Sequence, residues 1–215
     1  MKKNLLYLIT GSVLFLLFII LLIIDKSVGD RPITGFLGNI NNTVDYKYNH
    51  TVDVISDLLL YASFIFVACA IVLGILQLIK NKSLFKVDRI IIIYGIFAVL
   101  SLALWIFFDK IIKTSYRPLN DENSYPSTHV FVFIYFSSFG TIILSRFIKN
   151  ELLKKILLLL TLIIGVVLMP TLRVLCGMHY ITDVFGGVLL GLSLFFISIA
   201  LSIKNEKNNE IEHDN

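Results

Sequence analysis

The chain has 215 residues, of which 57% are hydrophobic and only 16% are charged. This composition excludes a water-soluble globular domain and a disordered chain, and it predicts an integral membrane protein. The net charge is +4, but the cations are scattered between long apolar runs rather than gathered on one polar face. The charge pattern therefore argues against a nucleic-acid-binding role.

Six apolar stretches are each long enough to cross the roughly 30 Å hydrocarbon core of a bilayer as a helix. They lie near residues 5–24, 58–79, 90–108, 130–148, 156–169 with its flanks, and 184–203. We expect the first to be a retained span rather than a signal peptide, because its apolar core is long and no small-residue cleavage site follows it. The predicted fold is an all-α, six-span transmembrane bundle over residues 1–204, followed by a polar, disordered tail over residues 205–215.

Lysines and arginines are unequally divided between the two sides of these spans. Twelve of the 19 lie at the N-terminus, in the second-to-third and fourth-to-fifth loops and in the tail. Because cytoplasmic loops carry an excess of Lys and Arg, we expect both termini to be cytoplasmic. The abundance of Ile, Lys and Asn suggests a bacterial cytoplasmic membrane protein.

The first outer loop, residues 25–57, contains apolar residues at helical spacing: Ile33, Phe36, Leu37 and Ile40. This pattern predicts a short helix that either lies in the membrane interface or packs on the bundle. Later in this region, Asp53 and Asp57 form an i, i+4 carboxylate pair. We interpret them as acids that suit the N-terminal dipole of the second span. The two cysteines, Cys69 and Cys176, lack zinc-ligand spacing and are expected to be packing residues.

The third-to-fourth and fifth-to-sixth loops must open on the same outer face, because two spans separate them. Taken singly, their polar residues have ordinary explanations. Lys110 and Lys113 can extend their amines out of the membrane, Arg117 can cap a helix or pair with Asp121, and Arg173 can meet a lipid phosphate. Charges at this depth are costly, however, so their concentration on one face indicates a site.

Together, Lys110, Arg117 and Arg173 can surround a multivalent anion, and the forked donors of arginine match phosphate oxygens. Ser127 precedes the fourth span, so it can act as the N-cap, while free backbone N–H groups at the helix start also point at the anion. This arrangement places His129 beside the bound phosphate.

His179 and Asp183 are spaced i, i+4, which on a helix brings the carboxylate beside the imidazole. The carboxylate can then fix the tautomer of His179, and this histidine becomes a positioned nucleophile. The second histidine, His129, can supply a proton to the departing alkoxide.

In order and spacing, this set of residues resembles the three signature motifs of the type 2 phosphatidic acid phosphatase superfamily. The matching residues are Lys110, Arg117-Pro118, Pro126-Ser127-Thr128-His129, Arg173, His179 and Asp183. The resemblance implies that Lys110, Arg117, Ser127, Thr128 and Arg173 bind phosphate, that His129 acts as acid and then base, and that His179 attacks phosphorus with Asp183 behind it. It also implies a phosphohistidine intermediate and no need for a metal or another cofactor.

Two positions depart from the family pattern, which has Gly where Thr128 stands and Ser where Leu172 stands. Glycine lets a backbone come closest to a ligand, so Thr128 narrows the approach to phosphate. We expect a phosphatase acting on a lipid phosphate or diphosphate of the undecaprenyl diphosphate, phosphatidylglycerophosphate, phosphatidic acid or lipid A type, with no protein partner. The alternative is a membrane protein that binds or passes anionic lipids without catalysis, although binding alone needs neither a carboxylate four residues after a histidine nor a second histidine.

Overall fold

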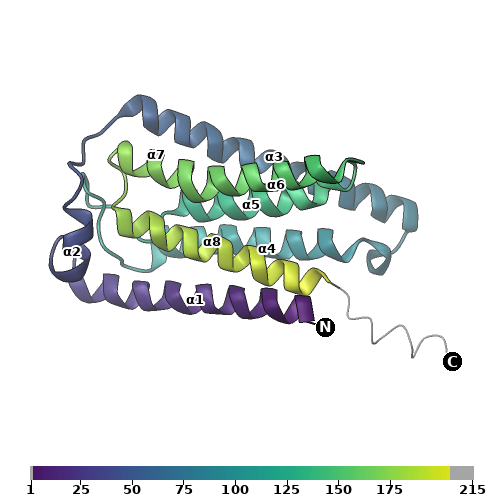
Figure 1. The fold of residues 1–215 in the computed structure, drawn as a ribbon, viewed down its shortest axis with the longest axis horizontal. Coiled ribbons are helices and arrows are strands. Elements are labelled where there is room, and N and C mark those ends of the chain that lie inside the picture. Colours follow the sequence, from purple (N-terminus) through teal and green to yellow (C-terminus); the bar gives the residue numbers. More distant parts are fainter. Residues whose placement is uncertain (1, 204–215) are drawn as a thin grey trace.

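The computed structural model describes residues 2–203, which form a bundle of helices that run along one long axis (Figure 1). The helices are α1 (Lys2–Val28), α2 (Gly35–Asn41), α3 (His50–Asn81), α4 (Arg89–Ile106), α5 (Thr128–Ser145), α6 (Glu151–Ile163), α7 (Met169–Leu175) and α8 (Ile181–Ser202). A short 3₁₀ turn, η1 (Leu84–Lys86), precedes α4, and the π-helical segments η2 (Phe107–Ile111) and η3 (Ile164–Leu168) follow α4 and α6. The tail expected at 205–215 lies outside the described residues.

Six helical segments of the described chain are long and apolar enough to cross a membrane, as the sequence predicts. The fifth is Glu151–Leu175, which the structure builds from α6, η3 and α7 as one 25-residue run. Lys154 near its start pairs with Glu151 at 2.6 Å, and Pro170 lies in the first turn of α7. Lys154 and Pro170 therefore both lie within a continuous helical segment.

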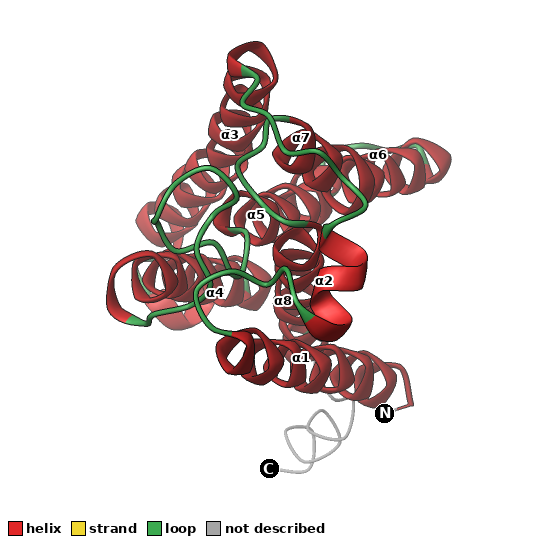
Figure 2. Ribbon diagram, turned by 90° about the vertical axis from the view of Figure 1, so that its left-hand side faces the viewer, coloured by secondary structure: helices red, strands yellow, loops and turns green. Residues whose placement is uncertain are grey.

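Figure 2 looks along the bundle and shows α5 surrounded by other helices. Buried residues make up 72% of the α5 span and 67% of the α8 span, against 11–28% of the other four. Close approach of α8 to α5 depends on glycine. A Cβ atom added at Gly187 would lie 2.7 Å from the carbonyl oxygen of Ser127, and one at Gly191 would lie 3.0 Å from Cα of Phe131. Small residues thus let these two helices pack backbone to backbone.

The two ends of the bundle can be distinguished by the segments that lie there. The described ends of the chain, at the start of α1 and the end of α8, lie at one end, whereas α2 and the α7–α8 turn lie at the other (Figure 1). The predicted short helix is α2. Leu37 is buried against the bundle, which agrees with the expected packing, while Phe36 is 68% exposed.

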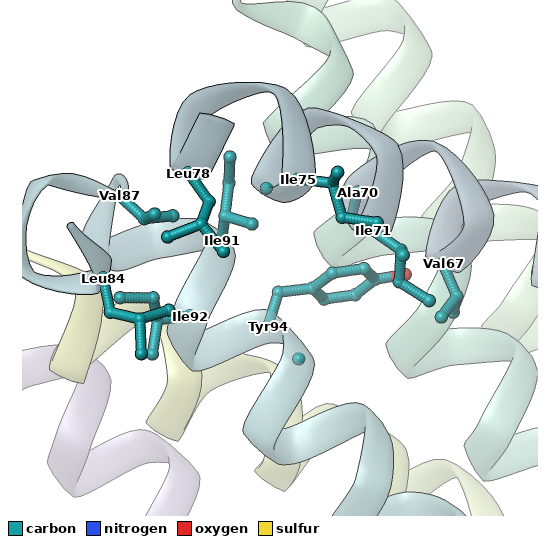
Figure 3. A pocket seen from close by; sticks show the side chains of 12 residues that line it. Val67, Ala70, Ile71, Ile75, Leu78, Leu84, Val87, Ile91, Ile92 and Tyr94 are labelled. Atoms are coloured by element: carbon teal, nitrogen blue, oxygen red, sulfur yellow. The ribbon is translucent and has the colours of Figure 1, made fainter. Parts of the chain in front are cut away.

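An apolar pocket of about 260 Å³ lies between α3 and α4, next to the turn that joins them (Figure 3). Its walls are aliphatic except for Tyr94, whose hydroxyl donates to the carbonyl of Phe136 at 2.8 Å. The pocket offers no free polar group for chemistry. The polar residues gather at the opposite end of α3.

Candidate active site

Arg173 is buried on α7, which packs against the first turns of α3. Only 1% of this residue is exposed, and its Nη1 donates to Oδ1 of Asp53 at 2.6 Å and to Oγ of Ser56 at 2.9 Å. Oδ1 of Asp57, one turn further along α3, lies 3.8 Å from the same nitrogen. The buried Nε of Arg173 has no hydrogen-bond partner, so it remains available to a ligand.

Arg117 lies in the loop between η2 and α5. Its backbone N–H donates to the carbonyl of Glu122 at 2.9 Å, and its Nη1 lies 2.7 Å from a carboxylate oxygen of the same residue. The pairing with Asp121 considered from the sequence does not occur, because Asp121 pairs with Arg31 at 3.1 Å. As in Arg173, the buried Nε of Arg117 has no partner.

Lys110 lies apart from the buried groups. Its side chain is 74% exposed, and its amine pairs with Asp109 at 2.8 Å. It nevertheless lines the same cavity, of about 570 Å³, as Arg117, Thr128 and His129. The expected phosphate-binding cations are therefore a buried arginine, Arg173, a largely buried one, Arg117, and an exposed lysine, Lys110.

Ser127 occupies the N-cap position of α5, as expected, but its hydroxyl makes no capping hydrogen bond. Its backbone N–H donates to the carbonyl of Asp183 at 3.0 Å, which ties the start of α5 to α8. The Oγ atom is fully buried without a partner, and Thr128 follows as the first residue of the helix. A hydroxyl held this way can donate to an anion at the helix start.

His129 also lies on the first turn of α5, with 17% of its side chain exposed. Its Nε2 lies 2.9 Å from Oδ1 of Asp57 on α3. Because an ionised carboxylate can only accept, Nε2 must carry the hydrogen. The other ring nitrogen, Nδ1, is buried without a partner.

His179 lies in the turn between α7 and α8, not on the helix that carries Asp183, which corrects the expected helical pairing. Gly177 makes the turn possible because its φ of 76° favours glycine, and a Cβ there would lie 2.7 Å from the carbonyl oxygen of Lys47. The backbone N–H of His179 then donates to the carbonyl of Arg173 at 3.2 Å. The turn brings the imidazole of His179 beside Asp183, although the two residues do not lie on the same helix.

The contact between His179 and Asp183 passes through Ser124. Nδ1 of His179 lies 3.8 Å from Oδ2 of Asp183, which is too long for a hydrogen bond. Oγ of Ser124 lies 3.3 Å from Nδ1 and also makes a short hydrogen bond to Oδ2. The hydroxyl has one hydrogen, which it donates to the carboxylate, so its oxygen accepts from Nδ1–H. This tautomer leaves the lone pair of His179 on Nε2.

His179 is also held in its neutral form. Burial, followed by the charges of Arg173 and Arg117, lowers the pKa of His179 well below its ordinary value of 6.5. Both arginines and His129 therefore act electrostatically on the imidazole of His179. A neutral imidazole with a free Nε2 lone pair is the form that can act as a nucleophile.

The free polar atoms of the site form a set. Among residues 2–203, ten buried side-chain nitrogen and oxygen atoms lack a hydrogen-bond partner, and six belong to residues expected to act. They are Nε of Arg117, Oγ of Ser127, Nδ1 of His129, Nε of Arg173, Nε2 of His179 and Oδ1 of Asp183. Leaving a buried polar group unpaired costs about 1–3 kcal/mol. Most of these atoms are donors or nucleophiles, so an oxygen-rich anion suits the set.

Four contributors to the site were missed by the sequence reading. Asp53, Ser56 and Asp57 reach the site from α3, and Ser124 precedes the expected motif at Ser127. Asp53 does lie in the first turn of α3, as the dipole interpretation requires, but that interpretation omitted its ion pair with Arg173. The overlooked signal was the position of these α3 residues. They begin a span on the face where the third-to-fourth and fifth-to-sixth loops also open.

A metal site does not stand out in the part of the chain that the structure describes, where no cluster of three or more His, Cys, Asp or Glu side chains has metal-binding geometry.

Comparison with known proteins agrees with the fold. Residues 103–207 match the PAP2 superfamily, and no curated protein matches the chain in sequence. The chain is similar to the crystal structure of a transmembrane PAP2-type phosphatidylglycerolphosphate phosphatase from Bacillus subtilis, with a TM-score of 0.57. The two are 20% identical, over 94% of this chain and 96% of the other. The matched segment contains the motifs from Lys110 to Asp183, and the similar structure shares the all-helical fold of this chain.

Proposed function

We propose that this protein hydrolyses a lipid phosphate or diphosphate through a phosphohistidine on His179, at the non-cytoplasmic face of a bacterial cytoplasmic membrane. The observation that carries the proposal is the free Nε2 of the buried His179, on which the charges of Arg173 and Arg117 act. The Nε atoms of Arg117 and Arg173, Oγ of Ser127 and the N–H groups that begin α5 are donors for phosphate oxygens.

In the first step, Nε2 of His179 attacks phosphorus, and the bond from phosphorus to the lipid oxygen breaks. His129 gives its Nδ1 proton to that oxygen, so the lipid leaves as an alcohol or, from a diphosphate, as a monophosphate. In the second step, Nδ1 of His129 takes a proton from water, whose oxygen attacks the phosphohistidine. Inorganic phosphate leaves and both histidines return to their starting forms.

The placement across the membrane rests on charge. The sequence assigns 12 of the 19 Lys and Arg to the side of the two termini. The candidate site lies at the end of the bundle opposite to the described ends of the chain (Figure 1). The excess of cations favours a cytoplasmic position for the chain ends. The site then faces outward, where it meets lipid headgroups of the outer leaflet.

The test is phosphate release by purified protein from a panel of lipids. Phosphatidylglycerophosphate comes first, because the Bacillus subtilis protein of similar fold is named for it; undecaprenyl diphosphate and phosphatidic acid follow. We expect release from at least one lipid, unchanged by EDTA and absent with His179→Ala. Lipid binding without release by the wild-type protein would support the non-catalytic alternative, and loss of release in EDTA would contradict metal independence.

A further inference from the structure

A polar face of α3 enters the candidate site from outside the family-matched segment, residues 103–207. It consists of Asp53, Ser56 and Asp57, which occupy the first two turns of a largely apolar span. Polar groups at this depth are costly unless they pair or serve a site. The three side chains therefore need an explanation beyond the common motifs.

The three residues divide their contacts. Asp53 and Ser56 both engage Nη1 of Arg173, at 2.6 Å and 2.9 Å. Asp57 lies 3.8 Å from that nitrogen but 2.9 Å from Nε2 of His129. The guanidinium is thus already paired without Asp57, whose shorter contact is with the histidine.

We propose that Asp57 is the positioning residue of His129: its carboxylate holds Nε2–H, turns Nδ1 toward the substrate, and stabilises the imidazolium that donates the proton. This inference rests on the proposed function. Through both steps the hydrogen stays on Nε2 of His129 and is donated to the Asp57 carboxylate. Nδ1 first gives a proton to the leaving oxygen and then takes one from water. Only the charge on the ring changes, and Asp57 faces that change directly.

The charges around His129 explain why such a carboxylate is needed. Arg173 on α7 and Arg117 in the preceding loop act on this imidazole, and their positive charges repel an imidazolium. His179 faces it from the α7–α8 turn, while Asp53 and Asp109 supply more distant negative charge. Asp57 is the carboxylate in hydrogen-bond contact, where Coulomb attraction is strongest. A bound phosphate adds negative charge but departs within each cycle.

Asp57→Asn removes the charge and keeps an oxygen that can accept from Nε2–H. We expect this variant to lose about tenfold or more in the first-turnover rate on a lipid phosphate, because proton donation by a positioned acid contributes about 10²–10⁴-fold. The loss should be much smaller on an aryl phosphate, whose leaving group needs no proton. The alkaline limb of the lipid pH profile should move to lower pH, and Asp57→Glu should recover part of the rate.

Activity on the aryl phosphate also reports whether Asp57→Asn is folded. The matched control is Asp45→Asn, at an exposed aspartate paired with Lys47, which should leave both substrates and the pH profile unchanged. In a His129→Ala background, Asp57→Asn should cause no further loss, since the two residues act as one unit.

Equal losses on both substrates with an unmoved pH profile would overturn the inference and assign Asp57 to the support of Arg173. Full additivity with His129→Ala would overturn it as well. These outcomes leave the proposed function intact, because it depends on turnover by the wild-type protein and its loss in His179→Ala. A wild-type protein without turnover would overturn both.

Discussion

The Oγ atom of Ser124 lies 3.3 Å from Nδ1 of His179. The same hydroxyl bonds the carboxylate of Asp183, so the serine links the acid to the imidazole across a gap of 3.8 Å. Asp183 is fixed in turn by the backbone N–H of Tyr180, which donates to its Oδ2 at 2.8 Å. The tautomer of His179 therefore depends on a hydroxyl, with the carboxylate one step behind it.

Removal of this hydroxyl should impair the nucleophile without removing it. We expect Ser124→Ala to slow phosphoenzyme formation by about 10- to 100-fold, the range found for residues that orient metal-bound histidines. Ser124→Thr keeps the hydroxyl and should retain more activity than alanine. The rate is measured by rapid quench within the first turnover. Wild-type rates in Ser124→Ala would show that Asp183 alone sets the tautomer.

His129 should matter in proportion to the quality of the leaving group. A lipid alkoxide needs a proton, so His129→Ala should cost about 10²–10⁴-fold on the lipid substrate and much less on a nitrophenyl phosphate. The comparison is made in the first turnover, because His129 also activates water in the second step. Equal first-turnover losses on both substrates would mean that another residue is the acid.

The pKa of His179 leads to a prediction about pH. Because burial and the two arginines lower this pKa below 6.5, the neutral imidazole persists as the solution is acidified. In the ligand-free protein, nitrogen NMR of isotope-labelled histidine should still show a neutral ring for His179 at about pH 6, where an ordinary histidine is mostly protonated. The signal is assigned by its loss in His179→Gln. Protonation of His179 with a midpoint near its ordinary value would contradict the buried, cation-flanked geometry.

The orientation in the membrane can be tested with cysteine labelling. In intact cells, a membrane-impermeant maleimide should modify Asn120→Cys, in the loop before α5, and miss Asn81→Cys, at the end of α3. The unsubstituted chain sets the background, since Cys176 is buried and Cys69 lies within the α3 span. The reverse labelling pattern would place the candidate site on the cytoplasmic side.

The spans and the motif residues were predictable because hydropathy and spacing are local properties of the sequence. The central position of α5 was not, since lipid tails are as apolar as leucine and hydropathy cannot distinguish a lipid-facing from a buried face. The glycines at 187 and 191 are the nearest signal, because they allow α8 to approach α5 closely.

The site was predictable where its residues follow one another in a motif and unpredictable where they meet through the fold. The link between His129 and Asp57 joins α5 to α3, and no local pattern reports such a contact. The pairing of His179 with Asp183 was inferred from helical spacing, yet it depends on the turn at Gly177 and on Ser124. The two residues are neighbours, as the sequence predicts, but they do not share a helix.

The most direct test of the account is to trap the covalent intermediate. Purified protein is mixed with a radiolabelled lipid phosphate that it hydrolyses, and the reaction is stopped in alkaline detergent within the first turnover. We expect label on the protein that is stable to alkali, labile to acid and located at His179, absent in His179→Ala and reduced in Asp183→Asn. Turnover with no labelled protein, or label that persists in His179→Ala, would contradict the phosphohistidine mechanism.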